Sequence, residues 1–514
     1  MTVRTVRSKK IGFCMTQAIS SDWRDKASAL TLDARAFING QRVAALAGET
    51  FPVISPIDGK TIAQAARCKS EDVDAAVKSA RAAFESGVWS KQAPAKRKRV
   101  LQKWAEKLLA AKDELGLLET LDMGKPIKYS VNVDVPGAAN CIAWYAEAID
   151  KVYDEIAPTA HNTLALIRRE AMGVIGAIVP WNYPMLMSAW KLGPSLAAGN
   201  SIVLKPSEKS PLTAMRMAEL AIEAGLPPGV FNVVPGFGHE AGEALALHMD
   251  VDAIGFTGST RVGRKMLEYS GQSNLKRVFN ELGGKSANLI FADFNDLPRA
   301  AATAAGSMYF NQGESCNAPS RLFVEESIAD QFIDTIVAQS KNYAPGDPLD
   351  NNTVLGALVD QGQQRTVMDY IDAGKNEGAR LLTGGTAARE DTGGFYVNPT
   401  VFDNVNNHMK IAREEIFGPV LSIIRFKDEA DAVRMANDSS YGLHAAVWSS
   451  NIDRAHRVAG ALRAGTVHVN SYDEDDITVP FGGYKQSGNG RDKSLHALEK
   501  YTELKTTWIR LSSK

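Results

Sequence analysis

Three side chains in this sequence of 514 residues have the type and setting needed for chemistry at a carbonyl group. Cys316 lies in a loop behind a glycine turn at Gly313, and a thiol in such a loop is accessible enough to react as a nucleophile. Glu281 ends an apolar strand just before a glycine pair, where a carboxylate could act as a general base. Asn182 lies in a turn between two prolines, and its amide could donate to a developing oxyanion.

Each of these residues also has a purely structural interpretation. A lone cysteine is usually a buried, inert thiol. Glu281 could instead form an ion pair with Lys276 or Arg277, and Asn182 could simply stabilise its turn. We interpret Cys316 as more than an ordinary buried cysteine only because Glu281 and Asn182 accompany it in the sequence.

Two turns with the composition of phosphate-binding sites follow successive predicted strands. The segments 236–242 and 256–260 contain glycine and lie between a strand and a helix, so a phosphate could approach the free N–H groups of a helix N-terminus. Glu208 follows another strand, which ends at Lys205. A carboxylate there suits ribose hydroxyls and repels the extra phosphate of NADP, which favours NAD, while Lys205 keeps NADP as an alternative. The simpler interpretations are a tight turn at 236–242 and a helix-capping carboxylate at Glu208.

A regular alternation of apolar strands and helices begins near residue 172 and would position these side chains. A second alternation runs from Ser286 to about Asn470. The sequence therefore predicts an α/β protein with two successive parallel sheets, each covered by helices on both faces. The strands are expected near 173–179, 202–205, 230–234, 252–256, 277–281, 287–291, 320–325, 419–425, 444–448 and 466–470.

The composition argues against several classes of function. The 58 basic and 59 acidic residues leave a formal net charge of −1, which gives no overall basic field for nucleic acid or an anionic membrane. The uncharged segment 171–190 is long enough to cross a bilayer, but its two prolines favour a buried strand, a turn and a buried helix. Four scattered cysteines without metal-ligand spacing indicate a reducing compartment, the cytoplasm, and no metal site.

Seven segments occur in the order found in the aldehyde dehydrogenase superfamily, which the chain resembles over about residues 30–511. They are Pro180–Pro184, Leu204–Glu208, Phe256–Thr260, Glu281–Ser286, Phe310–Gly313 with Cys316, Glu414–Pro419 and Pro480–Lys485. The resemblance implies two doubly wound parallel-sheet domains and a β arm that forms a homodimer or homotetramer. The implied divisions are a Rossmann-like NAD-binding domain at 22–148 and 172–281, a catalytic domain at 282–485, an oligomerisation arm at 149–171 and 486–514, and a disordered extension at 1–21.

The resemblance also assigns roles to individual residues. Cys316 would attack the aldehyde, the Asn182 amide and the Cys316 backbone N–H would hold the oxyanion, and Glu281 would activate the water that hydrolyses the thioester. The residues implied to bind NAD, or alternatively NADP, are Ile178, Val179, Pro180, Trp181, Lys205, Ser207, Glu208, Gly238, Gly242, Phe256, Thr257, Gly258, Ser259, Leu282, Gly283, Glu415 and Phe417. The residues implied to bind the substrate are Tyr183, Met187, Trp190, Ser315, Asn317, Asp475, Asp476 and Phe481.

A narrower resemblance concerns the substrate. The segments 120–127, 144–153 and 480–508 are similar to the γ-glutamyl-γ-aminobutyraldehyde dehydrogenases of bacterial putrescine breakdown, which implies that aldehyde or a related aminoaldehyde. The alternatives are a broad-specificity enzyme, an aromatic aldehyde of the indole-3-acetaldehyde type, 3-hydroxypropionaldehyde and, remotely, a non-catalytic binding protein on the same scaffold. The acidic run 473–476 would attract a cationic group on the substrate, or would be only a solvated loop.

Overall fold

The computed structural model describes residues 23–472 and 474–512 of the chain. The chain divides into two units, residues 1–31 and residues 32–514. The described part of the first unit contains one helix, α1 (Trp23–Ala29). The disordered extension predicted over 1–21 lies outside the described residues, as does Asp473 of the acidic run. All other elements belong to the second unit.

The first large sheet of the second unit has seven strands in the order β11-β10-β7-β8-β9-β1-β2. The five strands from β11 to β9 are parallel, as the alternation predicts, whereas β1 and β2 form an antiparallel edge. Asn39 and Gly40, both with positive φ, form the hairpin turn between these edge strands. The strands are β1 (Ala36–Ile38), β2 (Gln41–Val43), β7 (Val174–Ile178), β8 (Ser201–Lys205), β9 (Phe231–Val233), β10 (Ala253–Thr257) and β11 (Arg277–Glu281).

Helices cover both faces of this sheet because the strand order reverses after β9. Right-handed crossovers put α7 and α8 on one face and α9 and α10 on the other. On the second of these faces α2, α9 and α10 bury apolar side chains, among them Val77, Leu245 and Met266, against Val203 and Ile254 of the strands. The helices are α2 (Ser70–Ser86), α3 (Pro94–Ala110), α4 (Lys112–Met123), α5 (Ile127–Tyr129), α6 (Val135–Ala148), α7 (Pro184–Ala198), α8 (Leu212–Ala224), α9 (Glu243–Leu247) and α10 (Thr260–Gln272).

The second large sheet also has seven strands, in the order β14-β17-β18-β13-β12-β20-β21. Only its edge strand β14 is antiparallel, another departure from a purely parallel sheet. Separate apolar clusters fill its two faces, one around Leu289, Phe323 and Val447 and one around Ile290 and Leu322. The strands are β12 (Ala287–Ile290), β13 (Arg321–Glu325), β14 (Arg380–Thr383), β17 (Thr400–Asp403), β18 (Val420–Phe426), β20 (His444–Trp448) and β21 (Thr466–Val469), and the helices are α11 (Leu297–Tyr309), α12 (Ala329–Ser340), α13 (Gln361–Asn376), α14 (Lys410–Arg413), α15 (Glu429–Asn437) and α16 (Ile452–Ala461).

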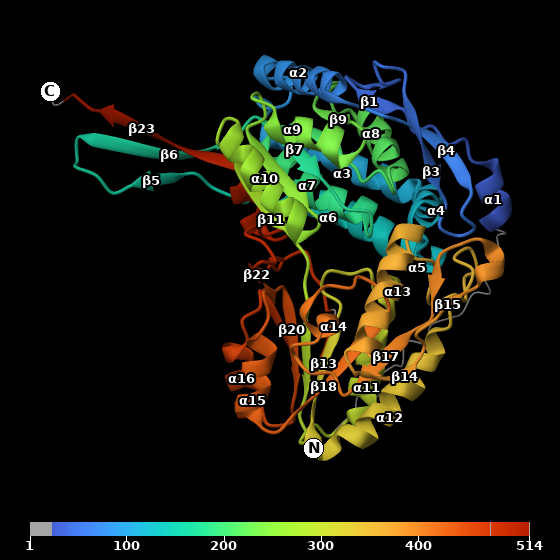
Figure 1. Cartoon of the computed structure of the whole chain (residues 1–514). Coiled ribbons are helices and arrows are strands. Elements are labelled where there is room, and N and C mark those ends of the chain that lie inside the picture. The colour runs from blue at the N-terminus through green and yellow to red at the C-terminus, as the bar shows by residue number, and fades with distance from the viewer. Residues whose placement is uncertain (1–22, 473, 513–514) are drawn as a thin grey trace, which may run out of the picture. The chain divides into compact units, whose positions relative to one another are not determined.

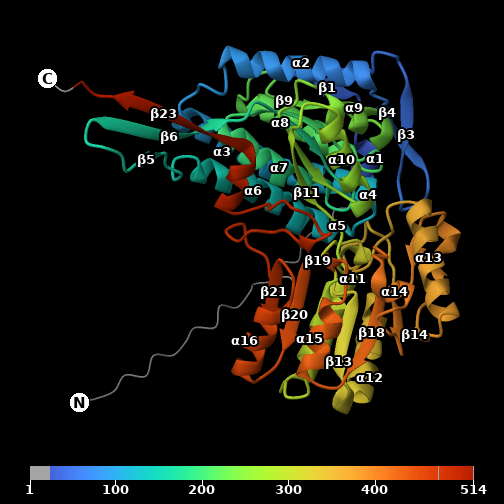
Figure 2. The same ribbon diagram turned by 60° about the vertical axis from the view of Figure 1, so that its left-hand side comes forward.

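A long antiparallel ribbon projects away from the helices in both views (Figures 1 and 2). The last strand, β23 (Thr502–Arg510), pairs along its whole length with β6 (Thr163–Ala171), and β5 (Glu155–Ala157) completes the ribbon. The remaining strand pairs are β3 (Thr50–Ile54) with β4 (Thr61–Ala66), β15 (Ala387–Ala388) with β16 (Tyr396–Val397), and β19 (Tyr441–Gly442) with β22 (Tyr484–Lys485). Short π- or 3-10 turns lie at Ser130–Asp134, Gly238–Gly242, Phe310–Gly313, Glu326–Ile328, Lys341–Tyr343, Glu390–Thr392 and Leu495–Tyr501.

The uncharged segment near residues 171–190 forms a buried strand, a turn and the start of a buried helix, as predicted. Within the part of the chain that the structure describes, no helix combines the length and the apolar character needed to cross a membrane.

Candidate active site

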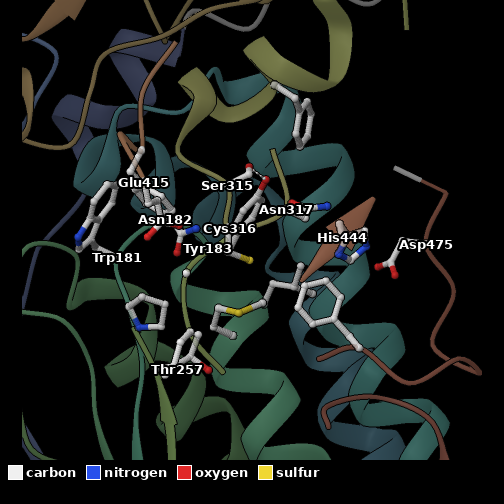
Figure 3. A pocket seen from close by; sticks show the side chains of 18 of the residues that line it. Trp181, Asn182, Tyr183, Thr257, Ser315, Cys316, Asn317, Glu415, His444 and Asp475 are labelled. Carbon is white, nitrogen blue, oxygen red and sulfur yellow. Dashed lines mark hydrogen bonds between the residues drawn. The ribbon is translucent and has the colours of Figure 1, made fainter. Parts of the chain in front are cut away.

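A cavity of about 660 Å³ lies where the parallel strands of the first sheet end and those of the second sheet begin. Its walls come from the segments after β7 and β10 and from those before β13, β18 and β20 (Figure 3). Strand ends at a reversal of strand order are the usual ligand site of open α/β sheets. The predicted residues that line the cavity are Pro180, Trp181, Asn182, Tyr183, Met187, Trp190, Thr257, Gly258, Ser259, Leu282, Gly283, Ser315, Cys316, Asn317, Glu415, Phe417, Asp475 and Phe481.

Other predicted residues lie outside the cavity wall. Glu281 and Phe256 belong to strands that end beside it, and Ile178 and Val179 to the end of β7. Lys205, Ser207 and Glu208 follow β8, the next strand of the sheet. The predicted residues not on the wall are Ile178, Val179, Lys205, Ser207, Glu208, Gly238, Gly242, Phe256, Asp476 and Glu281.

Cys316 is a free, half-buried thiol held by a strained turn. Asn311 and Gln312, just before it, have φ values of 49° and 60°, in the left-handed region that residues other than glycine rarely adopt. Side-chain amides hold the turn: Asn311 Nδ2 donates to the carbonyl of Asn182 at 2.9 Å, and Gln312 Oε1 accepts from the N–H of Gly356 at 3.2 Å. Backbone strain of this kind persists only where the surroundings fix it, often at a functional site.

Asn182 is fixed against the same loop. Its Nδ2 donates to the carbonyl of Glu314 at 2.8 Å, which occupies one of the two amide hydrogens. The residue is buried and lines the cavity together with Cys316. The second hydrogen of the amide is therefore available to a group bound beside the thiol, which a turn-stabilising role alone would not require.

Burial favours the protonated forms of the two reactive groups. It raises the pKa of the Cys316 thiol, and the nearby carboxylates of Glu415 and Glu281 raise it further. Burial also raises the pKa of Glu281 well above its usual value, an effect to which Asp492 adds and which Lys191 opposes. Both groups therefore gain their reactive, deprotonated forms as the pH rises.

The carboxylate of Glu281 makes no hydrogen bond with either oxygen among the residues that the structure describes. A Cβ atom at Gly482 would lie 2.8 Å from its Oε1, so the side chain faces that backbone rather than the cavity wall. The ion pair considered as an alternative is absent: Arg277 pairs with Glu503 at 2.9 Å, and Lys276 Nζ donates to the carbonyl of Ala246. That structural interpretation of Glu281 is wrong, because both neighbouring cations are engaged elsewhere.

A buried charged cluster behind Glu281 was not predicted from the sequence. Asp492 is fully buried and accepts from the Nζ atoms of both Lys191 and Lys500. These three residues come from α7 and from the segment that precedes β23, so no local pattern indicates their contact. Lys191 and Lys500 together outnumber the single negative charge of Asp492. Both lysines lower the pKa of Glu281 and so oppose part of the rise that burial causes.

The other end of the cavity fits a dinucleotide. Ser259 caps α10 by accepting from the N–H of Val262 at 3.4 Å, and this helix N-terminus borders the cavity, where free N–H groups favour phosphate. Lys205 Nζ lies 3.0 Å from Glu208 Oε2, and although burial opposes it, this ammonium lowers the pKa of Glu208 and keeps the carboxylate charged. A Cβ atom at Gly238 would meet nothing within 4 Å, which leaves open space beside this backbone.

Glu415 and Phe417 occupy the part of the cavity between this end and the thiol. Glu415 Oε1 accepts from the N–H of Gly284 at 3.0 Å, and burial raises its pKa to about 7. Phe417 has a φ of 58° and packs edge-on against Trp181, with ring centroids 5.1 Å apart. Within the described ranges 23–472 and 474–512, no group of three or more His, Cys, Asp or Glu side chains could hold a metal ion.

An aromatic wall lies on the other side of the thiol. Trp190 and Phe481 have ring centroids 5.0 Å apart, and the hydroxyl of Tyr183 lies 2.7 Å from Ser315 Oγ, next to Cys316. Glu474, which belongs to the predicted acidic run, and His444 also line this region. His444 was not predicted: it lies in no motif, and only the packing of β20 beside β12 brings it to the cavity.

The acidic run is not a block of free negative charge. Asp475 lies on the cavity wall but forms an ion pair with the buried Lys493. Asp476 lies off the wall, and its carboxylate accepts from the N–H and the Oγ1 of Thr478 at 2.8 and 2.6 Å. The attraction for a cationic substrate that the sequence predicted therefore depends mainly on Glu474, because the other two described charges have partners within the chain.

Comparisons with known proteins agree with this site. The sequence profile of the aldehyde dehydrogenase family matches residues 43–507. The NADP/NAD-dependent aldehyde dehydrogenase PuuC of Escherichia coli (strain K12) is 55% identical over 491 residues, which are 96% of this chain and 98% of PuuC.

Two solved structures are similarly close. The γ-glutamyl-γ-aminobutyraldehyde dehydrogenase of Burkholderia cenocepacia J2315 superposes with a TM-score of 0.94 at 59% identity, covering 96% of this chain and 99% of that one. The indole-3-acetaldehyde dehydrogenase AldA of P. syringae, solved in complex with NAD+ and IAA, gives a TM-score of 0.95 at 57% identity, covering 95% and 99%. The chain therefore belongs to the aldehyde dehydrogenase family.

Proposed function

We propose that this enzyme oxidises an aldehyde to the carboxylic acid with NAD+ or NADP+, through a covalent adduct on Cys316. One observation carries the proposal: a thiol and the Asn182 amide share a single cavity with a helix N-terminus suited to phosphate. NAD+ is the cofactor bound in the solved AldA complex, and PuuC is named as using either NADP or NAD. Here Glu208, charged beside Lys205, favours NAD+.

The first step forms the carbon–sulfur bond. The Cys316 thiol loses its proton to water, its Sγ adds to the carbonyl carbon, and the second Asn182 amide hydrogen and the Cys316 backbone N–H stabilise the resulting oxyanion. When bound, the nicotinamide cofactor accepts the hydride from the adduct carbon and so leaves a thioester on Cys316. Trp181 and Phe417 form the wall that orients the nicotinamide end beside the thiol.

Hydrolysis of the thioester needs a base. Glu281 in its carboxylate form takes a proton from a water molecule, whose oxygen attacks the thioester carbon, and the carboxylic acid and the Cys316 thiolate leave. Its side chain reaches the cavity by rotation, because no hydrogen bond among the described residues fixes either oxygen in its present place. Before this rotation, the Glu281 side chain lies in the space beside Gly482 and Gly490, which have no side chains of their own.

We propose γ-glutamyl-γ-aminobutyraldehyde or a related aminoaldehyde as the substrate. The name of the Burkholderia structure supports this choice. The aromatic wall of Trp190 and Phe481 and the name of AldA support an aromatic aldehyde of the indole-3-acetaldehyde type as the second candidate. Both candidates carry a nitrogen group beyond the aldehyde.

The test is the rate of reduced-cofactor formation at 340 nm. γ-Glutamyl-γ-aminobutyraldehyde, 4-aminobutyraldehyde, indole-3-acetaldehyde and propanal are compared by kcat/KM, with NAD+ and with NADP+. We expect a preference of about 10²-fold or more for an aliphatic nitrogen-bearing aldehyde over propanal. A preference for indole-3-acetaldehyde would replace the first substrate by the second, and no oxidation of any aldehyde would overturn the proposed function. Cys316→Ser serves as the inactive control.

We also propose that the protein is a homodimer or homotetramer of cytoplasmic subunits, with domain boundaries near residues 148, 171, 281 and 485. The arm supports the oligomer, because Ile156, Leu504 and Trp508 remain 68%, 66% and 65% exposed on it. The described cysteines, all free thiols, support a reducing compartment.

A further inference from the structure

His444 lines the cavity and has no role in the chemistry above. It is the first residue of β20, and in Figure 3 it lies on the opposite side of Cys316 from Trp181 and Glu415. It therefore borders the part of the cavity that holds the remainder of the substrate, beyond the reacting aldehyde.

The imidazole ring of His444 is held in place by a stack of rings. Its centroid lies 5.2 Å from that of Phe481 and 5.5 Å from that of His468, which in turn lies 5.5 Å from Tyr472. The Tyr472 hydroxyl donates to the carbonyl of Asn317 at 2.6 Å, so the stack is tied to the residue that follows the nucleophile. A ring fixed in this way presents its polar atoms in a constant direction.

The ring is a neutral hydrogen-bonding group beside the aromatic side chains of Trp190 and Phe481. Burial, with His468 and Lys493 nearby, lowers the pKa of His444 to about 3, so the ring carries no charge at physiological pH. A neutral imidazole has one donor and one acceptor nitrogen. Neither nitrogen has a hydrogen-bond partner among the described residues, and Nδ1 is buried. Leaving a buried polar atom unpaired is unfavourable, so a partner from outside the chain is expected.

Two spaces adjoin His444. Besides the main cavity, His444 borders a small polar cavity with Lys285 and Arg463, of about 20 Å³, the room of roughly one water molecule. Nδ1 is the buried nitrogen, so Nε2, which is not among the buried unpaired atoms, is the nitrogen left for the contents of the main cavity.

Charge alone does not select the substrate in this region. Lys493 neutralises Asp475, and its Nζ also lies 5.5 Å from the Trp190 ring and 5.8 Å from the Phe481 ring. Glu474 and Asp475 are both exposed on the wall, but among the described residues only Asp475 of these two has an ion-pair partner. A hydrogen bond, which does not require a charged substrate, is the selective contact that this wall offers.

We propose that His444 is a specificity-determining residue, whose ring nitrogen accepts a hydrogen bond from an N–H group of the substrate. The substrate class is an aldehyde that carries an amide or amine nitrogen beyond an aliphatic segment. This inference rests on the proposed function and narrows its substrate.

The test uses two aldehydes that differ only at the position to be recognised. 4-Acetamidobutanal carries an amide N–H, and 6-oxoheptanal has a CH2 in its place. For the wild-type enzyme we expect kcat/KM to be higher for 4-acetamidobutanal. In His444→Phe, which keeps an aromatic ring but no nitrogen, the ratio of the two kcat/KM values falls roughly three- to tenfold, the effect of one hydrogen bond. His444→Gln, which retains a hydrogen-bonding group, restores part of the ratio.

His468→Phe is the matched control, because His468 stacks behind His444 and does not line the cavity. We expect it to keep the wild-type ratio. An unchanged ratio in His444→Phe, or an equal fall in His468→Phe, would overturn the inference. If His444→Phe does not fold, His444→Leu carries the same prediction. The wild-type enzyme separates the two proposals: if it oxidises none of the aldehydes tested, the function is overturned and not only the role of His444.

Discussion

Burial sets the ionisation of the side chains around Cys316. The Cys316 thiol and Glu281 have raised pKa values because burial disfavours their charged forms. Burial also raises the pKa of Glu415 to about 7. Asp492, with Lys191 and Lys500 on either side, keeps a lowered pKa although burial opposes it. The carboxylates of this region therefore divide into Asp492, which cations hold ionised, and Glu281 and Glu415, whose protonated forms burial favours.

The pH dependence of turnover follows from these directions. Because the carboxylate form of Glu281 is the base, kcat should rise as the pH increases through its raised pKa. In Glu281→Gln the thioester should form but hydrolyse slowly, so intact-mass measurement after mixing with aldehyde and NAD+ should show an acyl group on the protein. A variant that turns over at the wild-type rate with the wild-type pH profile would show that another group supplies the base.

The oxyanion role of Asn182 gives a second prediction at this scale. Asn182→Ala should lower kcat by about 10²–10³-fold, the usual loss for one oxyanion donor. The matched control is Ser188→Ala on α7, the helix that follows the Asn182 turn, where Oγ donates to the carbonyl of Pro184 at 2.7 Å. Steady-state rates with thermal unfolding of both variants test this. Near-wild-type kcat in a folded Asn182→Ala, with chemistry limiting, would count against the role.

At the scale of elements, the turn before Cys316 is the critical one. Gly313 has a φ of 71°, and a Cβ atom there would lie 2.4 Å from the carbonyl oxygen of Gly418. Only glycine satisfies both the backbone angle and this close approach. Glycine at 313 was visible in the sequence as a turn, but its contact with the segment that carries Phe417 was not.

We therefore expect Gly313→Ala to displace the nucleophile loop. The variant should lose about 1–3 kcal/mol of stability through backbone strain, together with most of its activity. Gly460→Ala is the control, because Gly460 lies in α16, and a Cβ atom there meets nothing within 4 Å. This control should be neutral or gain up to about 1 kcal/mol. The measurements are the free energy of unfolding in denaturant and kcat for both variants. Equal changes in Gly313→Ala and Gly460→Ala would refute the steric argument.

At the scale of the whole molecule, the arm is the feature that the chain does not use internally. Strand β23 pairs with β6, yet nearly all its side chains are exposed, among them Leu504 and Trp508. Exposed apolar side chains on a projecting ribbon favour association with another copy.

Charged residues on the arm should therefore weaken assembly. Leu504→Lys with Trp508→Glu should shift the molar mass in light scattering toward the monomer at low concentration. Leu46→Lys, at a residue that is 70% exposed away from the arm, should leave the mass unchanged. A mass unaffected by the arm substitutions would locate the subunit contact elsewhere, and a monomeric wild type would overturn the oligomer.

The sequence by itself determined the local features of this protein. The alternation of apolar and amphipathic segments predicted the parallel core of both sheets, because the periodicity of a strand or a helix can be recognised within a short contiguous segment. The glycine turn before Cys316 and the ordered motifs indicated the family and the residues that share the cavity. These predictions succeeded because each depends on contiguous stretches of chain.

Only the tertiary structure decided how distant charges and rings meet. Lys191 contacts Asp492, which lies 301 positions away in the sequence, and both residues shift the pKa of Glu281. Lys493 neutralises Asp475, which removes much of the predicted attraction for a cationic substrate, and β20 brings His444 onto the cavity wall. Such contacts depend on how the two sheets pack, and packing is a property of the whole fold that no local pattern records.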